Sequence, residues 1–112
     1  MASMIKKNFN KPDDTKQPSA KIKFETVELN EHTLSRVTCD SGWRWSVDLK
    51  PVFNTDSCQI DHFLYVLSGK MMVKSDDGQE LEYEPGDIAH IPPGHDGWDI
   101  ANEPTVWLEI PH

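Results

Sequence analysis

The stretch His62-Phe-Leu-Tyr-Val-Leu-Ser-Gly69 decides the fold, together with Gly86-Asp-Ile-Ala-His-Ile-Pro-Pro-Gly94 further along the chain. In the first stretch, apolar, aromatic and β-branched residues end at a Ser-Gly pair, which predicts a short strand closed by a turn. The second stretch predicts a turn, a short strand over 88–91 and a rigid Pro-Pro-Gly corner. Between them, Asp77-Gly78 separates two strand-like runs, which is typical of a β-hairpin.

Short runs with a period of two continue on both sides of these stretches. Trp43–Lys50 shows the clearest alternation, and we expect a strand there that ends at Pro51. No segment shows ten residues of helical periodicity. Further strands are expected at 21–25, 33–39, 70–74, 81–83 and 105–110. About eight short strands separated by Gly, Pro and Asp predict an all-β sandwich or barrel.

Length and composition predict one domain. The chain has 112 residues, enough for one hydrophobic core and too few for two domains. Residues 1–20 are polar and show no periodicity, so we expect a short irregular N-terminal arm, mobile or wrapped on the surface, before a domain over 21–112. His32 and His112 are expected to face solvent.

The formal net charge of −8 excludes general binding to nucleic acid and disfavours anionic membrane surfaces. No apolar run is long enough to span a membrane, and no apolar segment follows Lys6 and Lys7 as it would in a signal peptide. We therefore expect a cytoplasmic protein. Two cysteines, Cys39 and Cys58, are consistent with this location, and no structural disulfide is expected.

The two stretches quoted first resemble the two sequence motifs of the cupin family. One motif has a ligand residue followed by a glycine, and the other has the order Gly, five residues, Pro, one residue, Gly. More narrowly, the runs GWRWSVDLKP, TDSC, YVLSG and IPPGHDGW look like small bacterial cupin-domain proteins of the RmlC-like type without assigned activity. The resemblance implies a jelly-roll antiparallel β-barrel with a pocket inside it, and a homodimer.

The resemblance also implies a divalent metal, which typical cupins bind through two histidines and a glutamate of the first motif and one histidine of the second. This chain departs from that pattern at every position. His62 stands at the glutamate, while Cys58 and Asp56 stand at the two histidines and Gly97 at the last one. A modified set remains, formed by Cys58, His62 and His95, with Asp56 as a further candidate.

Spacing constrains this modified set. Residues four apart on a straight strand lie about 13 Å from each other, so Cys58 and His62 can share a metal only if the chain bends over 59–61. Thiolate and imidazole ligands together favour Zn, Fe, Ni or Cu over Mg or Mn. Three protein ligands would leave one coordination position open for water or a small molecule.

Four apolar residues are candidates for the wall of a ligand pocket. Leu64 and Val66 share a strand face with His62, Trp98 lies close to His95 in sequence, and Trp45 is one of two tryptophans on the same expected strand face.

Every candidate residue for the metal site or the pocket also has a purely structural interpretation. Cys58 serves equally as a small buried apolar residue, His62 as a hydrogen-bonded interior histidine, and His95 as a loop cap or an acid/base group, while tryptophans usually pack in cores.

Two functions follow. In the first, a metal bound by Cys58, His62 and His95 holds a small organic molecule, with or without turnover of a small acid or sugar. In the second, a metal-free pocket binds a small ligand, or the domain serves in assembly. Fold alone does not choose between them, and no catalytic residue is assigned.

Overall fold

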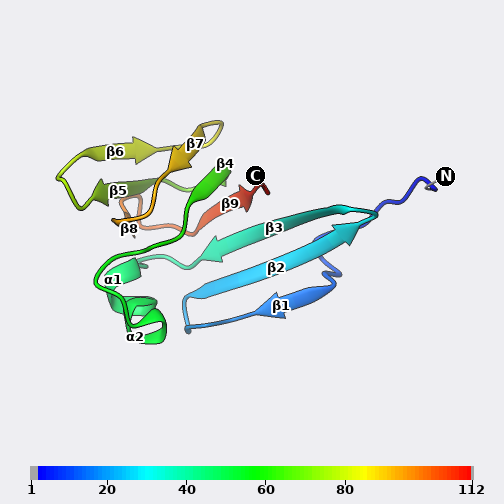
Figure 1. Cartoon of the computed structure of the whole chain (residues 1–112), viewed down its shortest axis with the longest axis horizontal. Coiled ribbons are helices and arrows are strands. Elements are labelled where there is room, and N and C mark those ends of the chain that lie inside the picture. Colours follow the sequence, from blue (N-terminus) through cyan, green and yellow to red (C-terminus); the bar gives the residue numbers. More distant parts are fainter. Residues whose placement is uncertain (1–2, 112) are drawn as a thin grey trace.

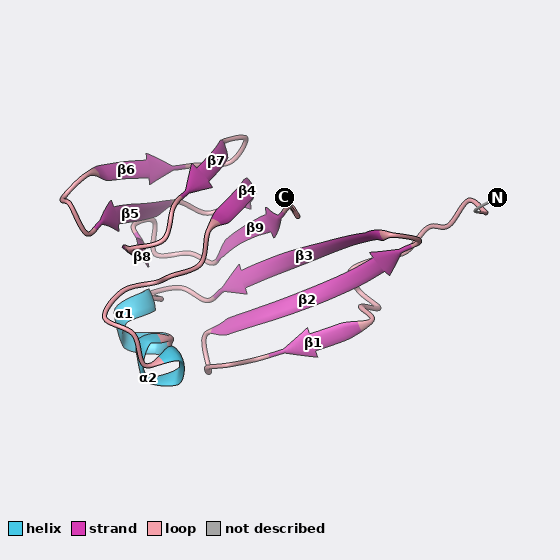
Figure 2. Cartoon of the chain, viewed as in Figure 1, coloured by secondary structure: helices cyan, strands magenta, loops and turns pink. Residues whose placement is uncertain are grey.

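The computed structural model describes residues 3–111, and two antiparallel sheets form its framework (Figure 1). The strands are β1 (Asp14–Lys16), β2 (Ile22–Leu29), β3 (His32–Cys39), β4 (His62–Ser68), β5 (Met71–Ser75), β6 (Glu80–Tyr83), β7 (Ile88–Ile91), β8 (His95–Asp99) and β9 (Thr105–Glu109). Two short helices, α1 (Trp45–Asp48) and α2 (Lys50–Phe53), lie between β3 and β4 (Figure 2).

The larger sheet has the order β1-β2-β3-β9-β4-β7, and the smaller sheet has the order β6-β5-β8. Along the chain, the strands after β4 pass back and forth between the larger and the smaller sheet, as they do in a jelly roll. The predicted all-β jelly-roll fold is therefore confirmed. The two sheets do not close into one continuous barrel, because β6 and β7 end their respective sheets without pairing to each other.

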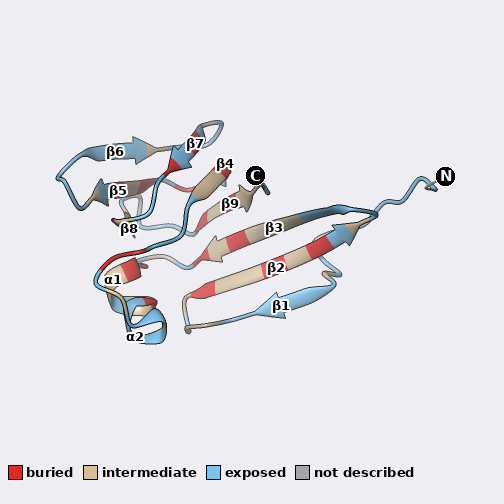
Figure 3. Cartoon of the chain, in the orientation of Figure 1, coloured by how far each residue is buried: buried red, intermediate tan, exposed pale blue. Residues whose placement is uncertain are grey.

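The core lies between the sheets and follows the strand period. Along β2 and β3, buried stretches alternate with less buried ones (Figure 3). In β4, Leu64 and Val66 are buried, whereas Tyr65 and Leu67 are exposed on the other face. In β9, Thr105 and Trp107 are buried and face the core. Because β4 pairs with β9 on one side and β7 on the other, its inward face is covered along its length. That buried face begins at His62.

The strand expected at Trp43–Lys50 is wrong, because this segment forms α1 and the start of α2. Trp45 and Leu49 are buried in either geometry, since residues four apart share one face of a helix as well as of a strand. Val47 distinguishes the two cases. A strand would place it beside Trp45, but it is 66% exposed on the opposite side of α1.

Two carboxylate side chains accept hydrogen bonds from backbone N–H groups at the start of α1. Asp48 Oδ2 accepts from Arg44 N at 2.8 Å, and Asp96 Oδ1 accepts from Ser46 N at 3.1 Å. Pro51 occupies a first-turn position of α2, where its missing N–H costs nothing, instead of ending a strand.

Two strands were not predicted. The N-terminal arm contains β1, whose residues are all exposed and which pairs with β2 through Asp14↔Thr26 and its neighbours. His95 was expected in a loop, but it begins β8, which pairs with β5. The Pro-Pro-Gly segment directly before β8 forms the expected corner, with Gly94 at φ +92. His32 is exposed, as expected, and His112 lies outside the described residues.

No helix within residues 3–111 is long and apolar enough to cross a membrane. Cys39 and Cys58 are both buried, and each has a free thiol. No disulfide was expected between them.

Gly69, which closes β4, requires both its backbone conformation and its missing side chain. Its φ is +78, and an added Cβ would collide with the carbonyl oxygen of Pro104 and lie 2.7 Å from Thr105 Cα.

We expect Gly69→Ala to lower the free energy of unfolding by about 3 kcal/mol, measured by denaturant titration. Gly78→Ala is the matched control, because its φ is +95 but no atom lies within 4 Å of the added Cβ. It should cost only about 1 kcal/mol, and equal losses in the two variants would show that the collision at Gly69 is relieved.

Candidate metal centre

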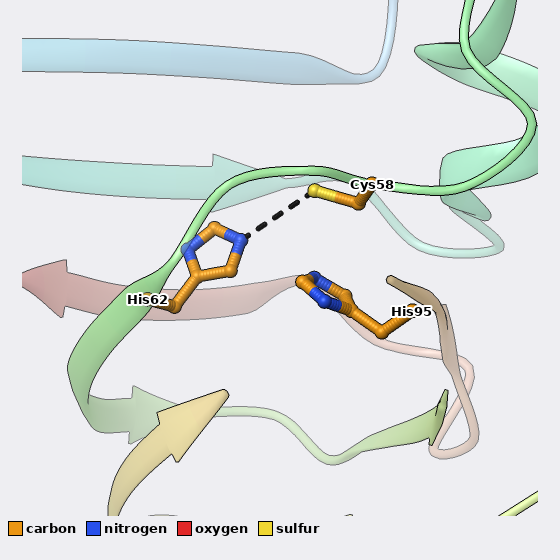
Figure 4. A group of neighbouring side chains, drawn as sticks. All are labelled: Cys58, His62 and His95. Atoms are coloured by element: carbon orange, nitrogen blue, oxygen red, sulfur yellow. Dashed lines mark hydrogen bonds between the residues drawn. The ribbon is translucent and has the colours of Figure 1, made fainter. Parts of the chain in front are cut away.

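Cys58, His62 and His95 converge in the interior. One potential ligand atom from each residue lies within 4.8 Å of the other two, and Figure 4 shows the three side chains turned toward one another. Cys58 is 3% and His95 5% exposed, and the side chain of His62 is 13% exposed. The structure thus brings together the three residues of the predicted set.

Asp56, the further candidate, is exposed and lies outside this cluster. The chain bends at 59–61, as the spacing required. This segment lies outside the strands, and Cys58 forms an isolated bridge with His95 instead of extending β4. Cys58 N donates to His95 O at 2.7 Å, and Gly94 N donates to Cys58 O at 2.7 Å. These bonds tie the first motif to the second directly beside the side chains of the cluster.

A hydrogen bond to its Nδ1 orients each histidine. His95 Nδ1 lies 2.9 Å from the carbonyl oxygen of Pro92, which can only accept, so this nitrogen carries the proton. His62 Nδ1 bonds to Glu109 Oε1, which also accepts from Trp107 Nε1 at 2.8 Å. Both neutral rings therefore keep Nε2 as the coordinating atom, in the carboxylate-or-carbonyl arrangement that supports metal-binding histidines.

The residues fit a tetrahedral metal ion. Bond lengths of 2.0 to 2.3 Å separate two ligands of such an ion by about 3.5 Å. Cys58 Sγ and His62 Nε2 are 3.7 Å apart (Figure 4). The upper limit of 4.8 Å for the other separations requires the cluster to tighten by about 1 Å, which is within reach of a side-chain rotation.

Hydrogen bonding dominates the electrostatics of the cluster. Burial acts to raise the pKa of Cys58, but hydrogen bonds to His62 and His95 outweigh it and lower this pKa to about 6. Burial acts to lower the pKa of His62, but hydrogen bonds to Cys58 and Glu109 raise it to about 9. Without a metal, the pair at neutral pH is therefore a thiolate and an imidazolium. A divalent ion at this site would take the place of the proton on His62 Nε2, and Cys58 would supply a thiolate.

A cavity of about 60 Å³ adjoins the cluster. Its walls include the three cluster residues and two of the predicted pocket residues, Trp45 and Leu64. The other two lie elsewhere. Val66 is completely buried further along β4, and Trp98 faces away from the cavity because its neighbour Gly97 lines it. The guanidinium of Arg44 stacks on Trp98 at 4.3 Å from the ring centroid.

A second, larger cleft of about 390 Å³ lies outside the core, between the β5–β6 hairpin and the Pro-Pro-Gly corner. Ile91 and His95 line both the cleft and the inner cavity, so these two side chains form the wall between them. His90 is exposed at this cleft and bonds through Nε2 to Asp61 at 2.7 Å.

Sequence reasoning did not identify Glu109, which holds His62. The pattern of β9 contains a usable clue, because Thr105, Trp107 and Glu109 alternate with three aliphatic residues. Either face could have been the interior, and the aliphatic face is the more natural choice. The structure instead buries the face with the tryptophan and directs the carboxylate toward the cluster.

Gly97 explains why the usual second-motif histidine is missing. A Cβ at this position would lie 3.2 Å from Trp43 Cη2 and 3.6 Å from Met72 O. The indole of Trp43 therefore occupies the space that a side chain at position 97 would need, and His95 supplies the imidazole from two residues earlier.

Several solved structures share this architecture. A polyketide cyclase, RemF from Streptomyces resistomycificus, has a TM-score of 0.66 at 16% identity, with 96% of this chain and 78% of that chain covered. An RmlC-like cupin from Shewanella frigidimarina has a TM-score of 0.54 at 15% identity, covering 88% and 84% of the two chains. A cupin superfamily protein from Desulfitobacterium hafniense has a TM-score of 0.53 at 11% identity, covering 87% and 84%. At these identities the likeness shows the fold.

No curated protein matches the sequence. The family model for the EutQ-like cupin domain matches residues 41–106, which include both motifs and all three residues of the cluster. The predicted cupin resemblance is confirmed, and the chain belongs to the EutQ-like cupin domain family.

Proposed function

We propose that this cupin binds one divalent transition metal ion, Zn, Fe, Ni or Cu, through Cys58 Sγ, His62 Nε2 and His95 Nε2. The observation that carries the proposal is the convergence of these three atoms within 4.8 Å, with the Nδ1 atom of each histidine already hydrogen-bonded. Buried imidazole and thiolate groups of this kind suit late transition metals. Three protein ligands leave one position free for water or a small molecule.

The bound metal would act as a Lewis acid toward a small organic molecule at the open position. The chain's own residues have defined tasks around it. Glu109 fixes the orientation of His62, the carbonyl of Pro92 fixes that of His95, and Leu64 contributes an apolar wall that limits access of water. The cavity of about 60 Å³ is small, so it suits a small organic acid better than a sugar.

One observation favours the metal-free alternative. Without a metal, Cys58 and His62 already form a hydrogen-bonded ion pair, in which the imidazolium lies between the Cys58 thiolate and the Glu109 carboxylate. A ligand-binding module without a metal is therefore the second candidate function, and metal content separates the two.

The homodimer and the cytoplasmic location stay predictions. Exposed apolar side chains on the outward face of the larger sheet support the homodimer. Tyr65 pairs in register with Ile88, which is 68% exposed, and Leu67 on the same face is 43% exposed.

Cys58→Ser should abolish stoichiometric metal binding, because serine does not supply a thiolate. The measurement is elemental analysis of protein purified without a metal-affinity tag, beside wild type. Cys39→Ser is the matched control, since Cys39 is equally buried and lines the same cavity but lies outside the cluster. Metal retained by the Cys58 variant, or absent from wild type after incubation with each metal, would refute the proposal.

Glu109→Gln should weaken metal binding by about 10-fold or more, because the amide accepts from His62 without the charge that makes the imidazole a better ligand. Competition with a chromophoric chelator gives the dissociation constant. Glu82→Gln, an exposed carboxylate on β6, is the control and should leave affinity unchanged. Equal affinities for wild type and Glu109→Gln would show that Glu109 does not support the metal ligand.

In the metal-free protein, Cys58 should titrate with a midpoint near pH 6, because its pKa is lowered to about 6 in the folded state. The thiolate is therefore present above this pH and is lost as the pH falls through it. Thiolate ultraviolet absorbance, taken as the difference between wild type and Cys58→Ser, reports it directly. Burial raises the pKa of Cys39, so that thiol should not contribute at neutral pH. A midpoint near the ordinary thiol value of about 8.5 would contradict the pairing with His62.

A further inference from the structure

Ile60 separates the inner cavity from solvent. It lines the cavity together with Cys58 and His62, and it is 43% exposed. Within residues 3–111, Ile60 is the one exposed residue among those that line this cavity, since Phe24 and His62 are half-buried and the rest are buried. Part of the Ile60 side chain therefore faces the cavity and part faces water, so the covering of the cavity is thinnest there.

Ile60 also stands at the centre of the bend that shapes the cluster. It is two residues from both Cys58 and His62, in a segment that belongs to no strand. Figure 4 shows this segment running beside the dashed line that joins the two side chains. Because the cavity of about 60 Å³ is small and its walls include the cluster, a molecule that passes Ile60 arrives directly at the cluster.

Hydrogen bonds tether the residues on either side of Ile60. Gln59 Nε2 donates to Ser57 Oγ at 3.0 Å, and the Asp61 carboxylate bonds to His90 Nε2 at 2.7 Å. The side chain of Ile60 itself has no donor or acceptor. It can therefore turn between its rotamers and uncover the cavity while the hydrogen bonds of its neighbours stay in place.

The outer cleft offers a second path to the cavity, but the wall on that side is closed. Ile91 and His95 form this wall, and each is 5% exposed. His95 is held by the bond from its Nδ1 to the Pro92 carbonyl and by its backbone bridge to Cys58. Opening this wall at His95 would break hydrogen bonds, whereas rotation of the Ile60 side chain breaks none.

We propose that Ile60 is the gate of the inner cavity and sets the size of the molecule that reaches Cys58 and the open metal position. The part of this inference that concerns the metal rests on the proposed function, whereas the cavity and its gate do not. Isoleucine is β-branched, so its χ1 is restricted and the gate has a defined shape. In an apolar site, a difference of one methylene changes selectivity by about 10-fold or more, so one side chain is enough to select by size.

Thiol reagents of two sizes test the gate in the metal-free protein. Full-length Cys39→Ser is the background, because it leaves Cys58 as the single thiol. Methyl methanethiosulfonate and benzyl methanethiosulfonate react in the same way: the thiolate attacks the sulfur that carries the methyl or benzyl group, a disulfide forms, and methanesulfinate leaves. The ratio of the two rates, followed by mass spectrometry of the intact protein, therefore reports the size of the opening and cancels the intrinsic reactivity of Cys58.

We expect Ile60→Ala to raise the ratio of the benzyl rate to the methyl rate by about 10-fold, because it removes three carbons from the gate. Ile60→Phe, which enlarges the gate, should lower this ratio. Ile100→Ala is the matched control and should leave the ratio unchanged, since Ile100 is 39% exposed but does not line the cavity.

An unchanged ratio in Ile60→Ala would overturn the gate. Equal acceleration of both reagents would also overturn it, because the thiol would then be reached by local unfolding of the bend and not through the cavity. Neither result bears on the metal site, which the metal content of wild type and Cys58→Ser tests separately.

Discussion

The backbone bridge between Cys58 and His95 is the constraint on which the site depends. Two short hydrogen bonds join Cys58, before β4 of the larger sheet, to Gly94 and His95, where β8 of the smaller sheet begins. Without this bridge, Cys58 would continue the line of β4 and lie about 13 Å from His62. With it, the thiol turns back over the imidazole, and the two sheets are joined where the three side chains meet. The fold and the site are therefore held by the same contact.

Period-two patterning, together with turn signals such as Asp77-Gly78, predicts most of the strands. The strands that contain the two motifs, the hairpin between them and the last strand all appear where the sequence places them, with ends shifted by a residue or so. Patterning failed at α1, because burial of Trp45 and Leu49 satisfies a helix and a strand alike. It failed at β1 for the opposite reason. That strand buries no side chain, and backbone pairing with β2 alone defines it.

The candidate site, too, could be predicted from the sequence only in part. The three residues of the cluster could be named from the sequence, because Cys58 and His62 stand at ligand positions of the first motif and His95 directly follows the second motif. Their supports could not be named in this way. Glu109 lies 47 residues from the histidine that it orients, and a main-chain carbonyl orients His95, which no residue type can indicate. Of the four residues expected in the pocket wall, Trp45 and Leu64 line the cavity. Trp98 was chosen for its nearness to His95 in sequence, whereas alternation along β8 turns it outward.

The departures from the usual cupin ligand pattern depend on one another. Trp43 lies against Gly97, so a side chain at that position would press on the indole, and the imidazole of the cluster comes from His95 instead. His95, at the start of the strand, reaches the cluster only because the Cys58 bridge places the two backbones side by side. A cysteine at position 58 then offers a short, soft ligand directly at the bridge. The proposed site is thus a coordinated replacement of the usual one, and a thiolate with imidazoles is a ligand set that suits late transition metals.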